Sequence, residues 1–187
     1  MAKKNPRLAP TSSDAVARPE EPQAQPVRPE ILTAGEFTWL SVARKEIGQR
    51  ELAGAAHNPR IIEYHGTTSL RGSMDEIPWC SSFVNWCIRQ AGYKGTNSAA
   101  ARSWREWGQR VRQPVRGCIA VLTRNGGGHV GFYMGMKDGR ILVLGGNQSN
   151  AVNIAAYDAE RLLAYVLPRN MSAHDNQVFY DATARIA

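Results

Sequence analysis

The sequence predicts an α+β domain in which a block of helices precedes an antiparallel β-sheet. Apolar residues recur at helical spacing up to about residue 108, whereas the runs after residue 117 are rich in β-branched and aromatic residues. The turn signal Lys137-Asp138-Gly139 joins two of these runs, which is typical of a β-hairpin. Helices and strands that come in blocks, rather than in alternation, indicate an antiparallel sheet.

Four helices are expected before the sheet. A capping box at 33–36 opens an amphipathic helix over 37–47, and Gly48 ends it. Asn58 offers an N-cap with proline at the first helical position, so a short helix follows up to Gly66. The other two helices are predicted from Cys80 to Gly92 and from a Ser98 cap to Gly108.

The strands are expected at 118–122, 129–136 and 140–146. Residues 152–158 add a further strand and residues 162–168 a short helix, which completes a domain over residues 35–168. Residues 1–34 hold most of the prolines and few aromatic residues, so they are predicted to be a disordered leader. Residues 169–187 are polar and aperiodic, and their structure is left unassigned.

Composition limits the class of function. The formal net charge of +7 and the pI near 9.7 favour anionic surroundings, including a bacterial wall polymer. Like charges do not form long runs and no RNA-binding aromatic motif is present, so nucleic acid is not expected as a partner. We expect a monomer with no membrane span and no Sec signal, because no long apolar run and no apolar signal segment are visible.

The three cysteines do not indicate disulfides or a metal site. Cys80 and Cys87 lie about 10 Å apart along one helix, beyond the reach of a disulfide. Their spacing also differs from that of zinc half-sites, so no metal and no organic cofactor are expected. Cys87 lies on the apolar helix face and Cys118 opens a buried strand, which favours a packing role for both.

Cys80 is the candidate nucleophile. It lies at the predicted start of a helix, but the helix dipole stabilises a thiolate by only about 1 kcal/mol, so a histidine must take the proton. His129 is the one histidine predicted on a rigid strand, and glycines at 126–128 leave room for a substrate backbone. We therefore expect Trp79, Ser81 and Gly128 to line a substrate cleft.

Two residues compete for the role of orienting His129. If the hairpin turn centres on Asp138, paired residue numbers sum to 276 and Asn147 lies opposite His129. A two-residue turn gives a sum of 277 and places Gln148 there instead. Asn147 is the first choice and Gln148 the alternative.

The segments PWCSSFVNWCIRQAG, GGHVGFYMG and ILVLGGNQSNAVNI, in this order, resemble the papain-like cysteine peptidases and amidases of the NlpC/P60 and CHAP superfamily, closest to a CHAP-like group with a Trp-Cys motif. The resemblance covers residues 36–168. It implies N-terminal helices packed on an antiparallel sheet, a helix-borne nucleophile at Cys80, a base at His129 and a polar third residue at Asn147. Family members often have Gly-Asp where this chain has Gly117-Cys118, which leaves the role of Cys118 open. Met74 occupies the position at which papain has the glutamine that stabilises the oxyanion, so the identity of the second oxyanion donor is also left open.

The resemblance implies a hydrolase that cuts amide bonds in cell-wall peptides, with peptidoglycan as the substrate. We expect a protein made in the cytoplasm and acting in the periplasm or cell wall after export by a secretion system or a phage lysis machinery. An antibacterial role of this kind would require a cognate immunity protein. The alternatives are a catalytically silent wall-binding module on the same fold, and a deamidase or acyltransferase that acts on a protein.

Overall fold

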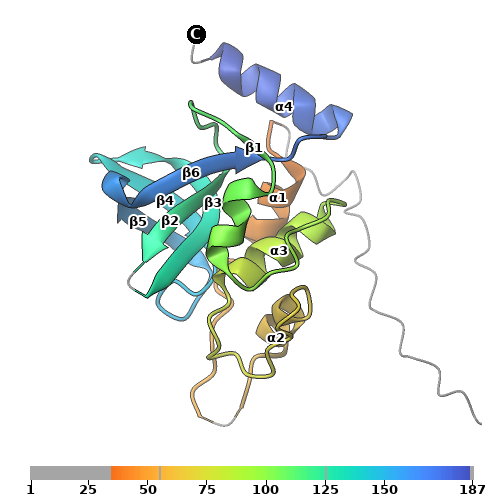
Figure 1. Ribbon diagram of the computed structural model, residues 1–187, viewed down its shortest axis with the longest axis vertical. Helices are drawn as coiled ribbons and strands as arrows, with labels where there is room; N and C mark the ends of the chain where they lie inside the picture. Colours follow the sequence, from red (N-terminus) through yellow and green to blue (C-terminus); the bar gives the residue numbers. More distant parts are fainter. Residues whose placement is uncertain (1–34, 55, 125, 186–187) are drawn as a thin grey trace, which may run out of the picture.

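The computed structural model describes residues 35–54, 56–124 and 126–185 (Figure 1). The predicted leader over residues 1–34 lies outside this part of the chain, and so does half of the predicted capping box. The helical elements and strands are α1 (Thr38–Lys45), α2 (Pro59–His65), α3 (Cys80–Gln90), η2 (Ala101–Glu106), β1 (Gln109–Arg110), β2 (Ile119–Arg124), β3 (Gly127–Lys137), β4 (Arg140–Gly145), β5 (Asn153–Asp158), η3 (Ala159–Arg161), β6 (Leu162–Leu167) and α4 (Ala173–Ala184).

The six strands form one antiparallel sheet in the order β1-β6-β2-β3-β4-β5. The β3–β4 hairpin turns through two residues with positive φ, Asp138 at 51° and Gly139 at 74°. Such a turn matches the right-handed twist of the two strands. The α+β class with an antiparallel sheet is therefore confirmed.

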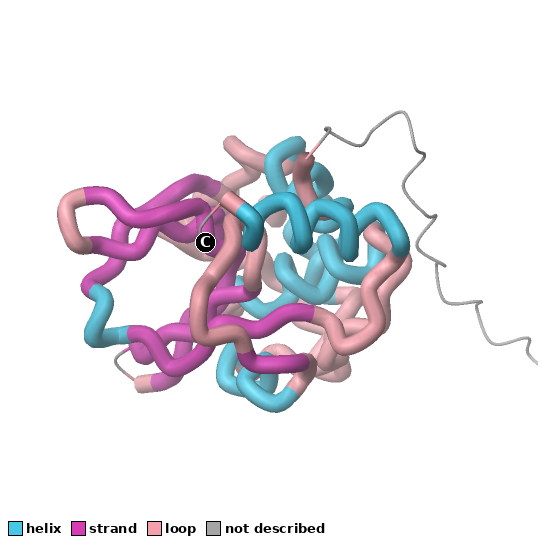
Figure 2. Tube along the Cα trace, turned by 90° about the horizontal axis from the view of Figure 1, so that it is seen from above, coloured by secondary structure: helices cyan, strands magenta, loops and turns pink. Residues whose placement is uncertain are grey.

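α1 and α3 lie against the sheet, and α2 packs on α3 (Figures 1 and 2). Aromatic rings fill the space between the layers: Tyr64 packs on Trp79, Phe83 and Trp86, while Phe83 also contacts Phe132 of β3. Burial of several large aromatic side chains contributes much of the hydrophobic stabilisation of a domain of this size. This packing fixes α3, and hence its first residue, against the middle of the sheet.

Local signals set the ends of the helices. The side chain of Asn58 accepts a hydrogen bond from the backbone N–H of Arg60 and so caps α2, as predicted. Gly92, with φ at 84°, follows the end of α3. The predicted helix over 98–108 is shorter in the structure and forms the 3₁₀ helix η2.

Three expectations are corrected by the structure. Residues 162–167 form strand β6 between β1 and β2, not a helix, because a short apolar run fits either structure and the sheet supplies backbone partners. Ile47, placed on the buried face of the first helix, is 47% exposed because α1 ends before it. The unassigned tail forms α4, which packs on the domain through the buried side chains of Asp175 and Val178.

Candidate functional site

Cys80 is the first residue of α3 and lies at the floor of a cleft. Its side chain is almost fully covered, with 5% of the residue exposed. The backbone N–H groups of Val130 and Ser81 lie within hydrogen-bond reach of the sulfur. Since Val130 follows His129 on β3, the thiol is held next to the strand that carries the predicted base.

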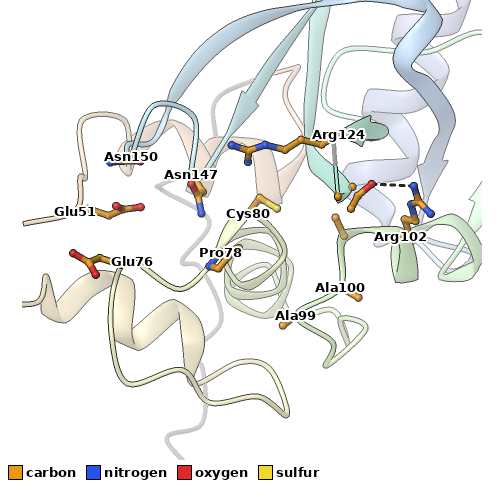
Figure 3. A pocket seen from close by; sticks show the side chains of 14 residues that line it. Glu51, Glu76, Pro78, Cys80, Ala99, Ala100, Arg102, Arg124, Asn147 and Asn150 are labelled. Atoms are coloured by element: carbon orange, nitrogen blue, oxygen red, sulfur yellow. Dashed lines mark hydrogen bonds between the residues drawn. The ribbon is translucent and has the colours of Figure 1, made fainter.

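The cleft has a volume of about 550 Å³ and opens to solvent between α3, the loop after β2 and the loop after β4 (Figure 3). Gly128 lines it, as expected from the sequence. Its other lining residues are Glu51, Glu76, Pro78, Cys80, Ala99, Ala100, Ala101, Arg102, Arg124, Gly126, Gly127, Asn147 and Asn150.

Trp79 and Ser81, which we expected in the cleft, do not line it. Both are fully buried, because the chain turns into α3 here and directs these side chains into the core. Trp79 donates its indole N–H to Glu51 at 2.8 Å. Ser81 donates to the carbonyl of Ser98 and accepts from the indole of Trp104, so both residues support the cleft wall from inside.

His129 is buried on β3 and is oriented by Gln148, the alternative to Asn147. Its Nε2 lies 3.0 Å from Oε1 of Gln148. The same oxygen accepts the hydroxyl of Tyr157, and the ring of Tyr157 lies 5.2 Å from the imidazole. Because Gln148 presents its oxygen here, Nε2 of His129 carries the proton and Nδ1 has the lone pair.

The amide of Gln148 has one orientation that satisfies its neighbours. Its nitrogen donates to the backbone oxygens of Val143 and Asn153 at 3.3 and 2.7 Å, and to the side-chain oxygen of Asn153 at 2.9 Å. If the amide were reversed, its own oxygen would face these three oxygens, and no donor would be present among the four acceptors. The network therefore fixes the tautomer of His129 through Gln148.

Asn147 is not the residue that orients His129, because the pairing of β3 with β4 ends before it. Pairing follows a sum of 277 near the turn, and a bulge between Tyr133 and Gly135 then shifts it to 276. The ladder ends at Gly145, before it could bring Asn147 opposite His129. The chain then turns, with Asn147 at a φ of 56°, and its side chain lines the cleft beside Cys80 (Figure 3).

Nδ1 of His129 is buried and has no hydrogen-bond partner among the described residues. The structure thus leaves the basic nitrogen free and does not join it to the thiol by a hydrogen bond. Contacts between a nucleophile and its base commonly tighten only when substrate binds.

Burial sets the resting charge state of the pair. It raises the pKa of the Cys80 thiol, against the opposing effects of the nearby backbone N–H groups and of Arg124. Burial, together with the positive charges of Arg124 and Arg161, also lowers the pKa of His129 to about 4, against the opposing effect of the hydrogen bond to Gln148. The resting pair is therefore a neutral thiol and a neutral imidazole.

The remaining cysteines and histidines lie away from the cleft. Cys87 and Cys118 are fully buried, and all three cysteines are free thiols. His65 is buried beside Ser82, and His57 lies 3.1 Å from Asp75. His174 contacts the backbone oxygen of Glu36.

Two groups of residues at the site were missed in the sequence. Tyr157 and Asn153 lie on β5, and the predicted strand at 152–158 gave no sign that it would border the histidine. Glu51, Arg102 and Arg124 line the cleft from three separate segments. The arginines over 102–116 were expected by default as a solvated face, with wall binding as the alternative, and Arg124 lies outside that range.

Within the described residues, no group of three or more metal-binding side chains is present, and no helix has the length and apolar character needed to cross a bilayer.

Comparison with known proteins gives one family match. The model of the CHAP domain matches residues 72–147, which include Cys80 and His129. A search of curated proteins finds no match.

Several solved structures are similar to this chain. A hypothetical invasion protein of Mycobacterium tuberculosis shares 22% identity at a TM-score of 0.46, over 72% of this chain and 61% of that chain. The peptidoglycan hydrolase RipB of the same organism shares 16% identity at a TM-score of 0.46, over 74% of this chain and 66% of that chain. RipD, also from Mycobacterium tuberculosis, is described as a non-catalytic NlpC/p60 domain protein adapted to peptidoglycan binding. It shares 19% identity at a TM-score of 0.43, over 70% of this chain and 93% of that chain.

The chain spans less than two thirds of the length of the first two of these proteins. At TM-scores below 0.5 the likeness assigns no role to any residue. The CHAP-domain model thus matches the part of the chain that runs from the loop before α3 to the loop after β4, and the helices packed on an antiparallel sheet agree with the arrangement that the resemblance implied.

Proposed function

We propose that this protein is a cysteine hydrolase that cuts an amide bond in the peptides of peptidoglycan, with Cys80 as the nucleophile, His129 as the base and Gln148 as the residue that orients the base. One observation carries the proposal. A thiol at the start of a helix opens on a cleft and adjoins a strand whose buried histidine has its tautomer fixed and its basic nitrogen free. The match of the CHAP-domain model to residues 72–147 supports the proposal.

The chemistry requires proton transfer within the pair. Nδ1 of His129 takes the proton of Cys80, and the thiolate attacks the carbonyl carbon of the substrate amide. As the C–N bond breaks, the imidazolium gives its proton to the leaving amine and a thioester remains. Water then gives a proton to Nδ1, its oxygen attacks the thioester, and the carboxylic acid leaves while the proton returns to the sulfur.

Two groups are suited to stabilise the oxyanion. The backbone N–H of Cys80 lies at the helix start, and the amide of Asn147 lines the cleft beside the sulfur (Figure 3). A loss of one oxyanion donor commonly lowers kcat by about a hundredfold or more. Asn147→Ala should therefore lower kcat with little change in KM, and an unchanged kcat would remove Asn147 from this role.

Digestion of purified sacculi tests the hydrolase. Wild-type protein should release soluble wall peptides, and mass spectrometry of the fragments would identify the bond. Cys80→Ala should abolish the release, whereas Cys87→Ala, which alters a buried thiol away from the cleft, should retain it. Equal release by wild type and Cys80→Ala would refute the proposal.

The alternative of a silent binding module has one observation in its favour, the absence of a hydrogen bond between the thiol and His129. In that case wild type and Cys80→Ala would both bind sacculi in a pull-down assay and neither would release fragments.

The biological setting is a further proposal, in which the enzyme attacks the wall of a competing or host cell and its producer is protected by an immunity protein that covers the cleft. Purification from the native host should then recover an inhibitor that blocks digestion. Recovery of fully active protein without any inhibitor would contradict this setting.

A further inference from the structure

A second concave site lies at the end of α3 that is remote from Cys80. It is a pocket of about 790 Å³ between the loop after α2 and the loop after α3, and it shares no described lining residue with the cleft. Arg89 lines it and follows Cys80 by nine residues on the same helix, so the two residues lie about 14 Å apart along the helix axis. The reaction proposed for Cys80 makes no use of this pocket.

The lining of the pocket is basic. Among its described residues three carry a positive charge, Arg71, Arg89 and Lys94, and none is acidic. The side chains of Arg89 and Lys94 form no ion pair and no hydrogen bond with another described residue. Positive charges that gather in one hollow repel one another, so an anion that enters relieves this repulsion.

Stabilisation of a helix end does not account for all of these cations. Basic residues near the C-terminus of a helix interact favourably with its dipole, which explains Arg89 in the last turn of α3. Arg71 reaches the pocket from the loop between α2 and α3, where it is not part of a helix. Separate segments of the chain thus bring their charges to the same hollow.

The walls of the pocket are held by hydrogen bonds. The backbone N–H of Ser69 donates to the carbonyl of Asn97 at 2.9 Å, which joins the two loops. Asn85 lines the pocket and is fully buried, and its side-chain oxygen accepts from the backbone N–H of Asn97 at 3.0 Å. A Cβ atom at Gly95 would overlap this oxygen, so glycine allows the loop to pass here. The pocket is therefore formed before a ligand arrives, which lowers the entropic cost of binding.

Uncharged polar groups lie among the cations. The side chains of Ser69 and Asn97 form no hydrogen bond with another described residue. Tyr93 is the one aromatic residue in the described lining, whereas single-stranded nucleic acid binds to several aromatic rings on which its bases stack. Guanidinium and ammonium groups bind phosphate, and a free amide and a free hydroxyl bind alcohols. The lining therefore suits a ligand that carries both phosphate and hydroxyl groups.

We propose that this pocket binds a phosphate-bearing polyol, the repeating unit of polymers in which polyols are joined by phosphodiesters. Arg71, Arg89 and Lys94 pair with the phosphate, while Ser69 and Asn97 bind the hydroxyl groups. Residues 94–97 border this pocket and residues 99–102 border the cleft, so a bound polymer is held next to the cleft. The inference goes beyond the proposed function and does not depend on the chemistry of Cys80.

Titration of the full chain with a synthetic oligomer of glycerol phosphate tests the site. Calorimetry should show saturable binding at millimolar concentration or below. Arg89→Gln and Lys94→Gln together should weaken this binding about tenfold, the loss expected for two exposed charged contacts. Backbone NMR shifts caused by the oligomer should map to residues 66–72 and 92–97, and not to Cys80 and Gly128.

Arg112→Gln and Lys137→Gln together are the matched control, because they remove the same charges at exposed positions outside both the pocket and the cleft. An oligonucleotide and vesicles of phosphatidylglycerol, at the same phosphate concentration, represent two other sources of phosphate and should bind more weakly than the oligomer. The inference is overturned if either binds more tightly, if the oligomer does not bind, if the pocket variant behaves like the control, or if the shifts map to the cleft.

Cys80→Ala separates this site from the proposed hydrolase, because it should bind the oligomer as tightly as wild type. Digestion of sacculi by the wild-type protein is measured in parallel. Binding of the oligomer without any release of fragments would refute the hydrolase and leave the pocket standing, whereas release of fragments without binding of the oligomer would do the reverse.

Discussion

At the scale of single residues, the amide of Gln148 explains how the histidine is held. Its oxygen accepts from His129 and Tyr157, while its nitrogen donates to three oxygens of Val143 and Asn153. A carboxylate here would leave its second oxygen facing those acceptors, which is costly in a buried site. Only a side chain with an acceptor and a donor serves both neighbours.

The pH dependence of the reaction follows from the burial of His129. Because burial first, and then Arg124 and Arg161, lower the pKa of this imidazole to about 4, the ring stays neutral and able to accept a proton throughout the range above that pH. The acid limb of kcat/KM should therefore lie near pH 4, well below the ordinary histidine value of about 6.5.

Arg124→Gln should move this limb to higher pH. Removal of a positive charge stabilises the protonated imidazole, so the pKa of His129 rises, and the pKa of the Cys80 thiol rises as well because Arg124 lowers it. Arg112→Gln, at an exposed site outside the cleft, should leave the profile unchanged. A limb near pH 6.5 that does not respond to Arg124→Gln would contradict the argument.

At the scale of elements, the site depends on a close approach between the loop after β4 and the start of α3. A Cβ atom added at Gly146 would collide with the ring of Trp79, with Cε3 at 2.6 Å, and would lie 2.8 Å from Cβ of Phe83. Glycine thus allows the loop to pass over the helix start, next to the turn that holds Gln148. This contact brings the loop that leads to Gln148 close to the helix start that carries Cys80.

Gly146→Ala should lower both stability and activity. Overpacking of this kind commonly costs about 1–3 kcal/mol, and the shift of the loop should displace Gln148 from His129. Urea unfolding and kcat measure the two effects. Gly127→Ala adds a Cβ with no atom within 4 Å and should leave the unfolding free energy unchanged, so equal stability of both variants would contradict this explanation.

The elements also show what the sequence could predict. The start of α3 at Cys80 and the position of the hairpin turn at 137–139 depend on local signals, and both were predicted correctly. The turn itself is the two-residue Asp138-Gly139 form, which was the alternative to a turn centred on Asp138. The choice between Asn147 and Gln148 was wrong because it depends on where the pairing of β3 with β4 ends and on a loop whose residues adopt positive φ. Neither feature leaves a periodic signal in the sequence.

At the scale of the whole molecule, the two ends of the described chain meet. Asp175 of α4 is fully buried and accepts hydrogen bonds from the backbone N–H and the hydroxyl of Thr38, at the start of α1, and from Tyr93 and Ser172. Residues 169–185 therefore pack as part of the domain that was expected to end at residue 168. The polar sequence of α4 concealed this, because the helix docks through the carboxylate of Asp175 together with a few apolar side chains such as Val178, which do not form a regular apolar stripe.

Asp175→Ala should destabilise the domain by about 3 kcal/mol, because it leaves several buried donors without an acceptor. Asp181→Ala is the matched control on the same helix: its carboxylate is exposed and accepts only from Gln177, so its loss should stay within about 0.5 kcal/mol. Since α4 does not line the cleft, both variants should keep wild-type kcat at temperatures where they are folded. Urea unfolding separates the two cases, and an equal free energy of unfolding for both variants would show that the C-terminal helix contributes nothing to the stability of the domain.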